Sequence, residues 1–465
     1  MKLRHLLVAV AALPGLAAAQ DITPGETKAI DTAVAKSLTA TGTPSASIAV
    51  VRGGRIVLAK AYGKASETIP QARPDLPYQI ASISKQFTAA AVLLLRRDGK
   101  LSLDDAVSKY ISGITGGDTI TIRQLLSHTS GLQDYWPQDY SFAAMEKPTT
   151  PQGIVDRWAR KPLDFASGTQ WQYSNTGYVV AGLIVEKVAG EPLLPFLQRR
   201  VFKPLGMKAM DQDLATGPRY PQGYHRYALG PVRPERPAAS GWLYAAGELA
   251  MSPTDLARWD LARLNRQLLT PEEWTLQETA IKLADGKDTG YGLGVDVGEQ
   301  NGRRIVEHGG EAVGFLSENI VYPDEKAAIV VLTNSDFGNA FTTIAADLAK
   351  IVLPAGTGQA TEPARTTTAA RHVYDMLRSG RLDRTLMTDD ANYYFTAEAL
   401  ADYRASLSAL GEPTGFEAVR APRLRGGFVN RNYRVTYPGR TLNVITYAEP
   451  GENGRYEQFL VQPAS

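Results

Sequence analysis

A serine and a lysine stand three residues apart at the start of an apolar segment. The stretch reads Gln79-Ile80-Ala81-Ser82-Ile83-Ser84-Lys85, and good helix formers follow it as far as Leu95. Because positions i and i+3 are neighbours on a helix surface, we expect the Ser82 hydroxyl and the Lys85 amine to share one face of the first turn. A hydroxyl becomes nucleophilic when a base takes its proton, and a desolvated lysine at the positive end of a helix can supply that base. The spacing therefore predicts acyl chemistry, with unpaired amide groups of the first turn available to an oxyanion.

Two other stretches give this short pattern its weight, since a pair of fixed positions in four residues arises by chance in many chains. They are Tyr173-Ser174-Asn175 and His308-Gly309-Gly310. Taken singly, each has an ordinary structural reading: Ser82 as a helix cap, Tyr173 as a half-buried aromatic, Asn175 as a turn residue and the glycine pair as a bulge. Together and in this order, they predict one catalytic site assembled from distant parts of the chain.

With these motifs and the framing stretch 125–131, the chain from Ile48 to Asn334 resembles the serine β-lactamase and D,D-peptidase superfamily. The similarity is to the branch that holds class C enzymes, esterases and D-aminopeptidases. It implies an α+β fold of the β-lactamase/transpeptidase type, in which helices flank an antiparallel sheet and a helical subdomain is inserted. It also implies hydrolysis of an ester or amide bond through an acyl-enzyme, with no cofactor and no metal.

The resemblance implies a role for each residue of the first two motifs. Ser82 would be the nucleophile that carries the acyl group. Lys85 would hold and deprotonate Ser82, or lower the pKa of Tyr173. Tyr173 would act as general base and then as the acid for the leaving group, for which its phenol needs cationic neighbours. Asn175 would bind Lys85 and the amide on the acyl side of the substrate.

The third motif is where this chain departs from the drug-hydrolysing members of the superfamily. His308 stands where those enzymes usually carry a lysine that holds the substrate carboxylate, and histidine is largely neutral at pH 7. The backbone N–H groups of Ser82 and of Glu311, just past Gly309 and Gly310, would form the oxyanion hole. We therefore expect an esterase or a D-amino-acid peptidase, with weak β-lactam hydrolysis left open as a side activity.

Four other functions are possible for a chain of this kind. A true class C-type β-lactamase and a non-catalytic sensor of muropeptides or β-lactams would use the same fold. A Ser-His-Asp hydrolase would need a Gly-x-Ser-x-Gly elbow, and a metallohydrolase would need clustered histidines; neither pattern is present. We expect a structural role for His128, while His225 and His372 carry no motif.

Composition limits the class of partner. The 465 residues include 50 Lys and Arg against 48 Asp and Glu, a formal net charge of +2, with no long run of one sign. We therefore expect a small-molecule or peptide substrate and no nucleic-acid partner. The chain has no cysteine, which excludes disulfides and thiolate metal ligands. The oligomeric state has no signal in the sequence.

The first residues resemble a targeting segment. Basic residues precede an apolar run from Leu6 to Leu16, and alanines near Ala19 form a small-residue cleavage site. The apolar run is short for a bilayer span. We expect residues 1–19 to be a signal peptide, the mature chain to be periplasmic or secreted, and no stable membrane insertion.

Hydrophobic patterning predicts two domains, as the length suggests. A hairpin turning at Gly53-Gly54 and several late strands flank a helical middle, which favours one antiparallel sheet closed from both ends of residues 20–353. Residues 354–370 are rich in Pro, Gly, Thr and Ala, and we interpret them as a linker before a small α+β accessory domain over 371–465. The late strands are expected at 292–297, 304–308, 317–322 and 327–334; helices are expected at 24–40, 121–131, 179–188 and 193–201, with others starting at 102 and 252.

Overall fold

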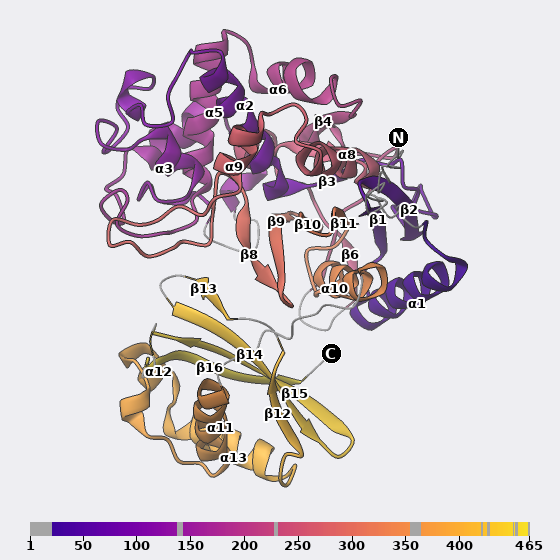
Figure 1. The fold of residues 1–465 in the computed structure, drawn as a ribbon, viewed down its shortest axis with the longest axis vertical. Helices are drawn as coiled ribbons and strands as arrows, with labels where there is room; N and C mark the ends of the chain where they lie inside the picture. Colours follow the sequence, from indigo (N-terminus) through magenta and orange to yellow (C-terminus); the bar gives the residue numbers. More distant parts are fainter. Residues whose placement is uncertain are drawn as a thin grey trace, which may run out of the picture.

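The computed structural model describes residues 21–136, 143–226, 231–353, 364–419, 422–425, 428–449, 451 and 454–463. The expected signal peptide lies outside these ranges. The two largest of four antiparallel sheets organise the described residues (Figure 1). Among these residues, no helix is both long enough and apolar enough to cross a membrane.

The larger sheet has six antiparallel strands in the order β2-β1-β11-β10-β9-β8. The first and last strands of the region meet where β1 pairs with β11, with Ile48 opposite Val331. This confirms the expected sheet closed from both ends. The strands are β1 (Ser45–Arg52), β2 (Arg55–Gly63), β8 (Asp296–Gln300), β9 (Arg303–Ala312), β10 (Phe315–Tyr322) and β11 (Ala327–Thr333).

Both faces of the sheet are covered. Successive side chains of a strand point to opposite faces, and β1 shows this directly. Ile48 and Val50 belong to a core shared with α1 (Pro24–Thr41) and α10 (Ala340–Val352), whereas Val51 belongs to the larger core of the helical region. The burial of all of β11, and of β1 as far as Val51, follows from this two-sided cover.

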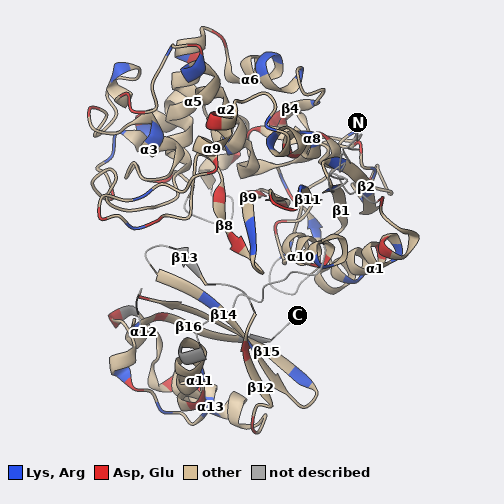
Figure 2. Ribbon diagram, viewed as in Figure 1, with Lys and Arg blue, Asp and Glu red and all other residues tan. Residues whose placement is uncertain are grey.

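The inserted helical region is built around α2 (Lys85–Arg97), whose residues 85–95 are all buried. Basic and acidic residues are scattered over the helices of the structure (Figure 2), but Lys85 is the single charged residue in this buried stretch. The other helices of the region are α3 (Ile122–Leu126), α4 (Pro151–Ile154), α5 (Asn175–Ala189), α6 (Leu193–Leu197), α7 (Tyr244–Gly247), α8 (Pro253–Leu264) and α9 (Pro271–Gln277). Short strands form two small sheets: β3 (Tyr78–Gln79) with β7 (Leu249–Met251) and β4 (Ala209–Asp211), and β5 (Tyr224–His225) with β6 (Arg233–Pro234).

Two sequence-based expectations in this region are wrong. The strand expected at 292–297 begins only at Asp296, because its glycines serve close packing instead. A Cβ on Gly294 would lie 2.7 Å from the Lys85 carbonyl oxygen, and one on Gly292 would lie 2.2 Å from that of Gln277. The helix expected to start at Ser102 is a turn, although Ser102 and its neighbours form the expected capping-type hydrogen bonds.

Three helices have other bounds than expected. Helix α6, expected at 193–201, ends at Leu197 and passes into a π-helical turn over Gln198–Phe202. Helix α3 ends at Leu126, and His128 then adopts φ 59°, which no helix continues through. Helix α5 starts at Asn175, before the expected Val179, because the Ser174 hydroxyl accepts a hydrogen bond from the Gly177 N–H and caps it.

Residues 364–463 form the second sheet with its own core. Helices and strands of this part bury Tyr374, Val435, Val444 and Phe459 together. Helix α11 begins at Ala364, so the end of the expected linker, residues 364–370, is helical, while residues 354–363 lie outside the described residues. The elements are α11 (Ala364–Arg378), α12 (Asp389–Tyr394), α13 (Ala397–Ser408), β12 (Gly415–Ala418), β13 (Arg423–Arg425), β14 (Phe428–Tyr437), β15 (Arg440–Ala448) and β16 (Tyr456–Pro463).

Candidate active site

Ser82 lies in a 3-10 turn, η1 (Ala81–Ser84), which runs directly into α2. Hydrogen bonds to β7 hold the turn on both sides: the Ile80 N–H donates to the Leu249 carbonyl, and the Ser84 hydroxyl accepts from the Leu249 N–H. Ala81 has φ 48°, a conformation that non-glycine residues seldom adopt and that is often kept at functional sites. Ser82 keeps part of its surface exposed while its neighbours in the turn are buried. The turn therefore presents one hydroxyl from a rigid backbone.

Lys85 lies beneath this hydroxyl and is fully buried. Its Nζ donates to Ser82 Oγ at 3.0 Å, to Asn175 Oδ1 at 2.8 Å and to the Ala246 carbonyl at 2.8 Å. Burial lowers the pKa of Lys85 to about 7, against the opposing effect of the nearby Asp134 carboxylate. A lysine with this pKa is partly neutral at physiological pH, and its lone pair then faces the Ser82 proton.

The Tyr173 side chain also reaches Ser82. Their side chains are hydrogen-bonded, and the Lys85 Nζ lies 4.8 Å from the centre of the Tyr173 ring. Although the residue keeps some exposed surface, surrounding protein atoms raise the pKa of Tyr173 well above its usual value, and the hydrogen bond from Ser82 offsets this in part. Tyr173 is therefore a phenol in the resting site. This environment favours Lys85 as the group that takes the Ser82 proton and Tyr173 as the group that protonates the leaving group.

Asn175 is oriented by a residue that the sequence analysis missed, Asp134. The backbone N–H of Asn175 donates to Asp134 Oδ1 at 3.0 Å, and its side-chain Nδ2 lies 3.2 Å from both carboxylate oxygens. This leaves the Asn175 Oδ1 as the atom that faces Lys85. Burial raises the pKa of Asp134. The one local signal in the sequence is its position three residues after the glycine turn at Gly131.

The third motif lies on the part of β9 nearest to Ser82. Pairing of β8 with β9 ends at Glu307, and the following residues of β9 lie against η1. Gly310 permits this approach, because a Cβ there would lie 2.2 Å from both the Ile80 carbonyl oxygen and Ser317 Oγ. A Cβ on Gly309 would meet nothing closer than 3.7 Å. Glu311 follows on the same strand with an exposed side chain, and its N–H as an oxyanion donor stays a prediction.

His308 on β9 is 4% exposed, and the centre of its ring lies 6.3 Å from that of the Tyr173 ring. Its Nε2 is 2.8 Å from the Tyr291 hydroxyl, and its Nδ1 is 2.6 Å from the Gly309 carbonyl oxygen. Burial, helped by the Lys85 charge, lowers the pKa of His308 to about 3. The side chain is neutral at pH 7, so it supplies no cation for a substrate carboxylate.

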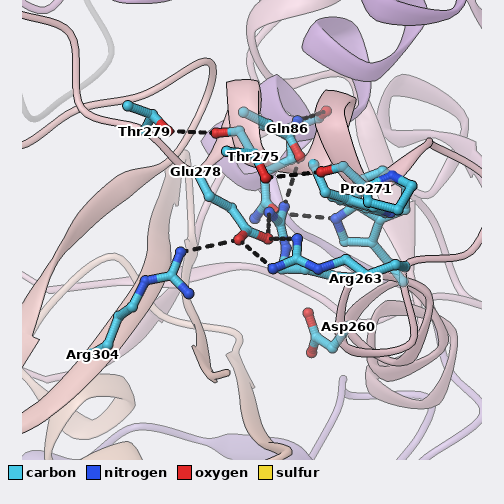
Figure 3. Close-up of polar contacts among 12 residues, drawn as sticks. Gln86, Asp260, Arg263, Pro271, Thr275, Glu278, Thr279 and Arg304 are labelled. Carbon is cyan, nitrogen blue, oxygen red and sulfur yellow. Dashed lines mark hydrogen bonds and ion pairs between the residues drawn. The ribbon is translucent and has the colours of Figure 1, made fainter. Parts of the chain in front are cut away.

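A buried polar network surrounds the start of α2, and Figure 3 shows the part of it that contains Gln86, Arg263, Glu278 and Arg304. The Gln86 side chain accepts from Arg263 at 2.9 Å and donates to Asn319 on β10 at 3.0 Å. Asn319 in turn donates to both oxygens of Asp260, and Arg263 is paired with Glu278 at 3.2 Å. Because Gln86 follows Lys85 directly, this network fixes the position of the lysine relative to the strands.

A small cavity of about 130 Å³ lies among the described residues, and none of the candidate site residues lines it. It is bounded by Gln79, three residues before Ser82, by Val313, which follows β9, and by Gln212, Asp213 and Ser240. Within the residues that the structure describes, no three His, Asp or Glu side chains are grouped as a metal site.

The sequence and the fold are similar to those of known proteins. The Beta-lactamase family model matches residues 30–353. Penicillin-binding protein 4* of Bacillus subtilis is 28% identical over 313 residues, covering 62% of this chain and 68% of that protein. A D-aminopeptidase of Brucella canis is 30% identical over 320 residues, covering 64% of this chain and 57% of that protein. This chain therefore spans less than two thirds of the Brucella enzyme.

Among solved structures, a D-stereospecific amidohydrolase from Streptomyces sp. is 29% identical, with a TM-score of 0.60, covering 69% of this chain and 98% of that one. The family match takes in all three motifs, from Ser82 to Gly310, and more than half of the sequence. With a serine, a lysine and a tyrosine meeting beside β9 inside that matched range, the chain belongs to the Beta-lactamase family and is a serine hydrolase of that family.

Proposed function

We propose that this hydrolase cleaves the amide or ester bond of a small D-amino-acid derivative or peptide, through an acyl-enzyme on Ser82. The observation that carries the proposal is the contrast between two basic side chains of the site. Lys85 is engaged with Ser82 at 3.0 Å and has its pKa lowered to about 7, while His308, beside the Tyr173 ring, is neutral because burial lowers its pKa to about 3.

Acylation follows from the positions of these groups. The Lys85 amine takes the Ser82 proton as Oγ bonds to the substrate carbonyl carbon, and the backbone beside Ser82 and Glu311 accommodates the oxyanion. The carbonyl then re-forms as the bond to the leaving group breaks, and Tyr173 gives its proton to the departing nitrogen or oxygen. The Lys85 ammonium returns a proton to Tyr173. Deacylation repeats these steps with water as the nucleophile.

The charge of the site favours one class of substrate. A neutral His308 offers little to a substrate carboxylate, which disfavours substrates that depend on one, including penicillins. The relatives named D-aminopeptidase and D-stereospecific amidohydrolase support a substrate with a D-configured residue on the acyl side.

The test compares initial rates on matched substrates: D- and L-alanine p-nitroanilide, a p-nitrophenyl ester, a D-alanyl dipeptide with a free carboxylate, and a penicillin. We expect the D-anilide or the ester to have the highest kcat/KM and the L-anilide and penicillin the lowest. A preference for the penicillin would instead identify a true β-lactamase. Acylation by a penicillin or peptide without turnover of any substrate would identify a sensor.

A further inference from the structure

Three buried rings form a hydrogen-bonded chain across the site, His128–Tyr291–His308. We infer that Tyr291 is a positioning residue, which holds the His308 ring as the Nδ1–H tautomer with its Nε2 lone pair occupied, and so excludes substrate carboxylates from this position. The effect on substrates rests on the function proposed above. The hydrogen-bond arrangement itself does not.

The contacts of His308 fix which group donates in its hydrogen bond with Tyr291. The Gly309 carbonyl can only accept, so the Nδ1 that lies 2.6 Å from it must carry the proton. A neutral imidazole has one N–H, and the Nε2 is therefore an acceptor. The Tyr291 hydroxyl, 2.8 Å away, must donate to it.

The contacts of His128 independently give the same order of donation, from His128 to Tyr291 and from Tyr291 to His308. The Ser174 backbone N–H can only donate, and it lies 3.1 Å from His128 Nδ1. The buried His128, whose pKa is lowered by desolvation, therefore carries its proton on Nε2 and donates it to the Tyr291 hydroxyl at 3.2 Å. Tyr291 accepts from one histidine and donates to the other, so a single hydroxyl satisfies both rings.

The surroundings of Tyr291 keep its proton available for this purpose. Tyr291 is 1% exposed, and burial raises the pKa of its phenol well above the usual value. The neighbouring Tyr178 gives its own proton to the Leu126 carbonyl at 2.5 Å. The Tyr173 ring lies against His128, with ring centres 4.1 Å apart. The three hydrogen-bonded rings therefore connect the segment around Tyr173 with His308 on β9.

The arrangement has a consequence for recognition. The His308 Nδ1–H points to the Gly309 carbonyl and the Nε2 lone pair to Tyr291, so the ring has no spare donor and no charge. A carboxylate placed here would lose its hydration without gaining a charged or hydrogen-bonding partner, which is unfavourable. A neutral acyl group loses nothing comparable.

The first test needs no substrate. Long-range ¹H–¹⁵N correlation spectra of the protein, labelled with ring-¹⁵N histidine, report the tautomer of each imidazole. The chain has only five histidines, so substitutions of single histidines assign the signals. We expect the Nδ1–H tautomer for His308 and the Nε2–H tautomer for His128. The opposite tautomer at either ring, or a charged His308 at pH 7, would overturn the inference even in a fully active enzyme.

The second test uses Tyr291→Phe. Its expected result is a shift of the His308 Nε2 signal to that of an acceptor without a hydrogen bond. Without the Tyr291 donor, the freed Nε2 can take up a proton when a carboxylate-bearing substrate binds, and it then donates to that carboxylate. The ratio of kcat/KM for a carboxylate-bearing substrate to that for its neutral amide should therefore rise about tenfold, the size expected for one hydrogen bond. An unchanged Nε2 signal or an unchanged ratio would contradict the role given to Tyr291.

Tyr322→Phe is the matched control. Tyr322 is equally buried, on β10, and its hydroxyl donates to Gln300 rather than to a histidine. It should leave the histidine signals and the substrate ratio unchanged. If neither substrate is turned over by the wild-type protein, the proposed function fails, and the tautomers still decide whether Tyr291 holds His308.

Discussion

The Lys85 amine lies 3.0 Å from the Ser82 hydroxyl and has no surface exposed to water. Its three hydrogen-bond acceptors come from η1, α5 and the α7 backbone, which are distant in the sequence. The packing that excludes water from α2 also lowers the pKa of Lys85, and this makes the amine available as a base.

The acylation rate should therefore rise with pH and level off above a midpoint near 7. The rate rises with pH because only the neutral Lys85 amine accepts the Ser82 proton, and the neutral fraction grows as pH increases through the lowered pKa of Lys85. Stopped-flow measurement of acylation between pH 5 and 9 tests this. Lys85→Arg, which stays charged over the whole range, should be slower by about 10²–10⁴-fold. A flat profile would remove Lys85 from the role of base.

Asp134→Asn should move that midpoint to lower pH. The Asp134 carboxylate raises the pKa of Lys85, so its removal makes the amine neutral at a lower pH. The amide oxygen of the variant can still accept from Asn175, and kcat above the midpoint should fall only modestly. Asp134→Ala, which releases Asn175 entirely, should reduce kcat further. A midpoint that moves upward in Asp134→Asn would show that the charge acts in another way.

Gly310→Ala should disable the site while leaving most of the fold in place. The added Cβ would collide with the Ile80 carbonyl oxygen and Ser317 Oγ, both 2.2 Å away, and would push β9 away from the Ser82 turn. Misplacement by about 1 Å reduces catalysis on the order of 10²-fold. Gly298→Ala on β8, whose Cβ would meet nothing within 4 Å, is the control for kcat and for the melting temperature. Equal activity in the two variants would argue against the close approach of β9.

Asp260→Asn should change how stability depends on pH. Burial raises the pKa of Asp260 to about 7, above its value of 3.8 in an unfolded chain. The folded state therefore holds this proton more tightly, and the stability that it contributes is present at low pH and is lost as pH rises towards 7. Urea denaturation at pH 5 and pH 8 should show a smaller difference between the two conditions in Asp260→Asn than in the wild type. An equal difference would mean that the carboxyl group does not titrate in the folded protein.

Much of the fold follows from patterns that are local in the sequence. The hairpin at Gly53-Gly54 and the apolar run of β11 are visible in a short window, and their pairing follows from the two-sided burial that such runs require. The prediction of a strand at 292–297 is wrong for a physical reason that the local sequence does not show. Its glycines are needed against the Gln277 and Lys85 carbonyl groups, and these contacts exist only in the folded protein.

In the candidate site too, residues in short motifs could be predicted, and residues that act only through contacts in the folded protein could not. Ser82, Lys85, Tyr173, Asn175 and His308 were predicted because each stands in a short motif, and the structure brings them together. Asp134 and Tyr291 were missed because neither has a motif. Asp134 acts on Asn175, which is 41 residues away, and Tyr291 joins two histidines 163 and 17 residues distant. The direction of the hydrogen bonds between those rings depends on backbone groups of Ser174 and Gly309, and sequence patterns do not report it.

The most direct test of the central claim is the mass of the intact protein, quenched in acid during turnover of a D-alanine ester and followed by peptide mapping. If Ser82 is the nucleophile, the wild-type protein carries one acyl adduct per chain, located on Ser82, and Ser82→Ala carries none. An adduct on a different serine, or undiminished hydrolysis by Ser82→Ala, would contradict it.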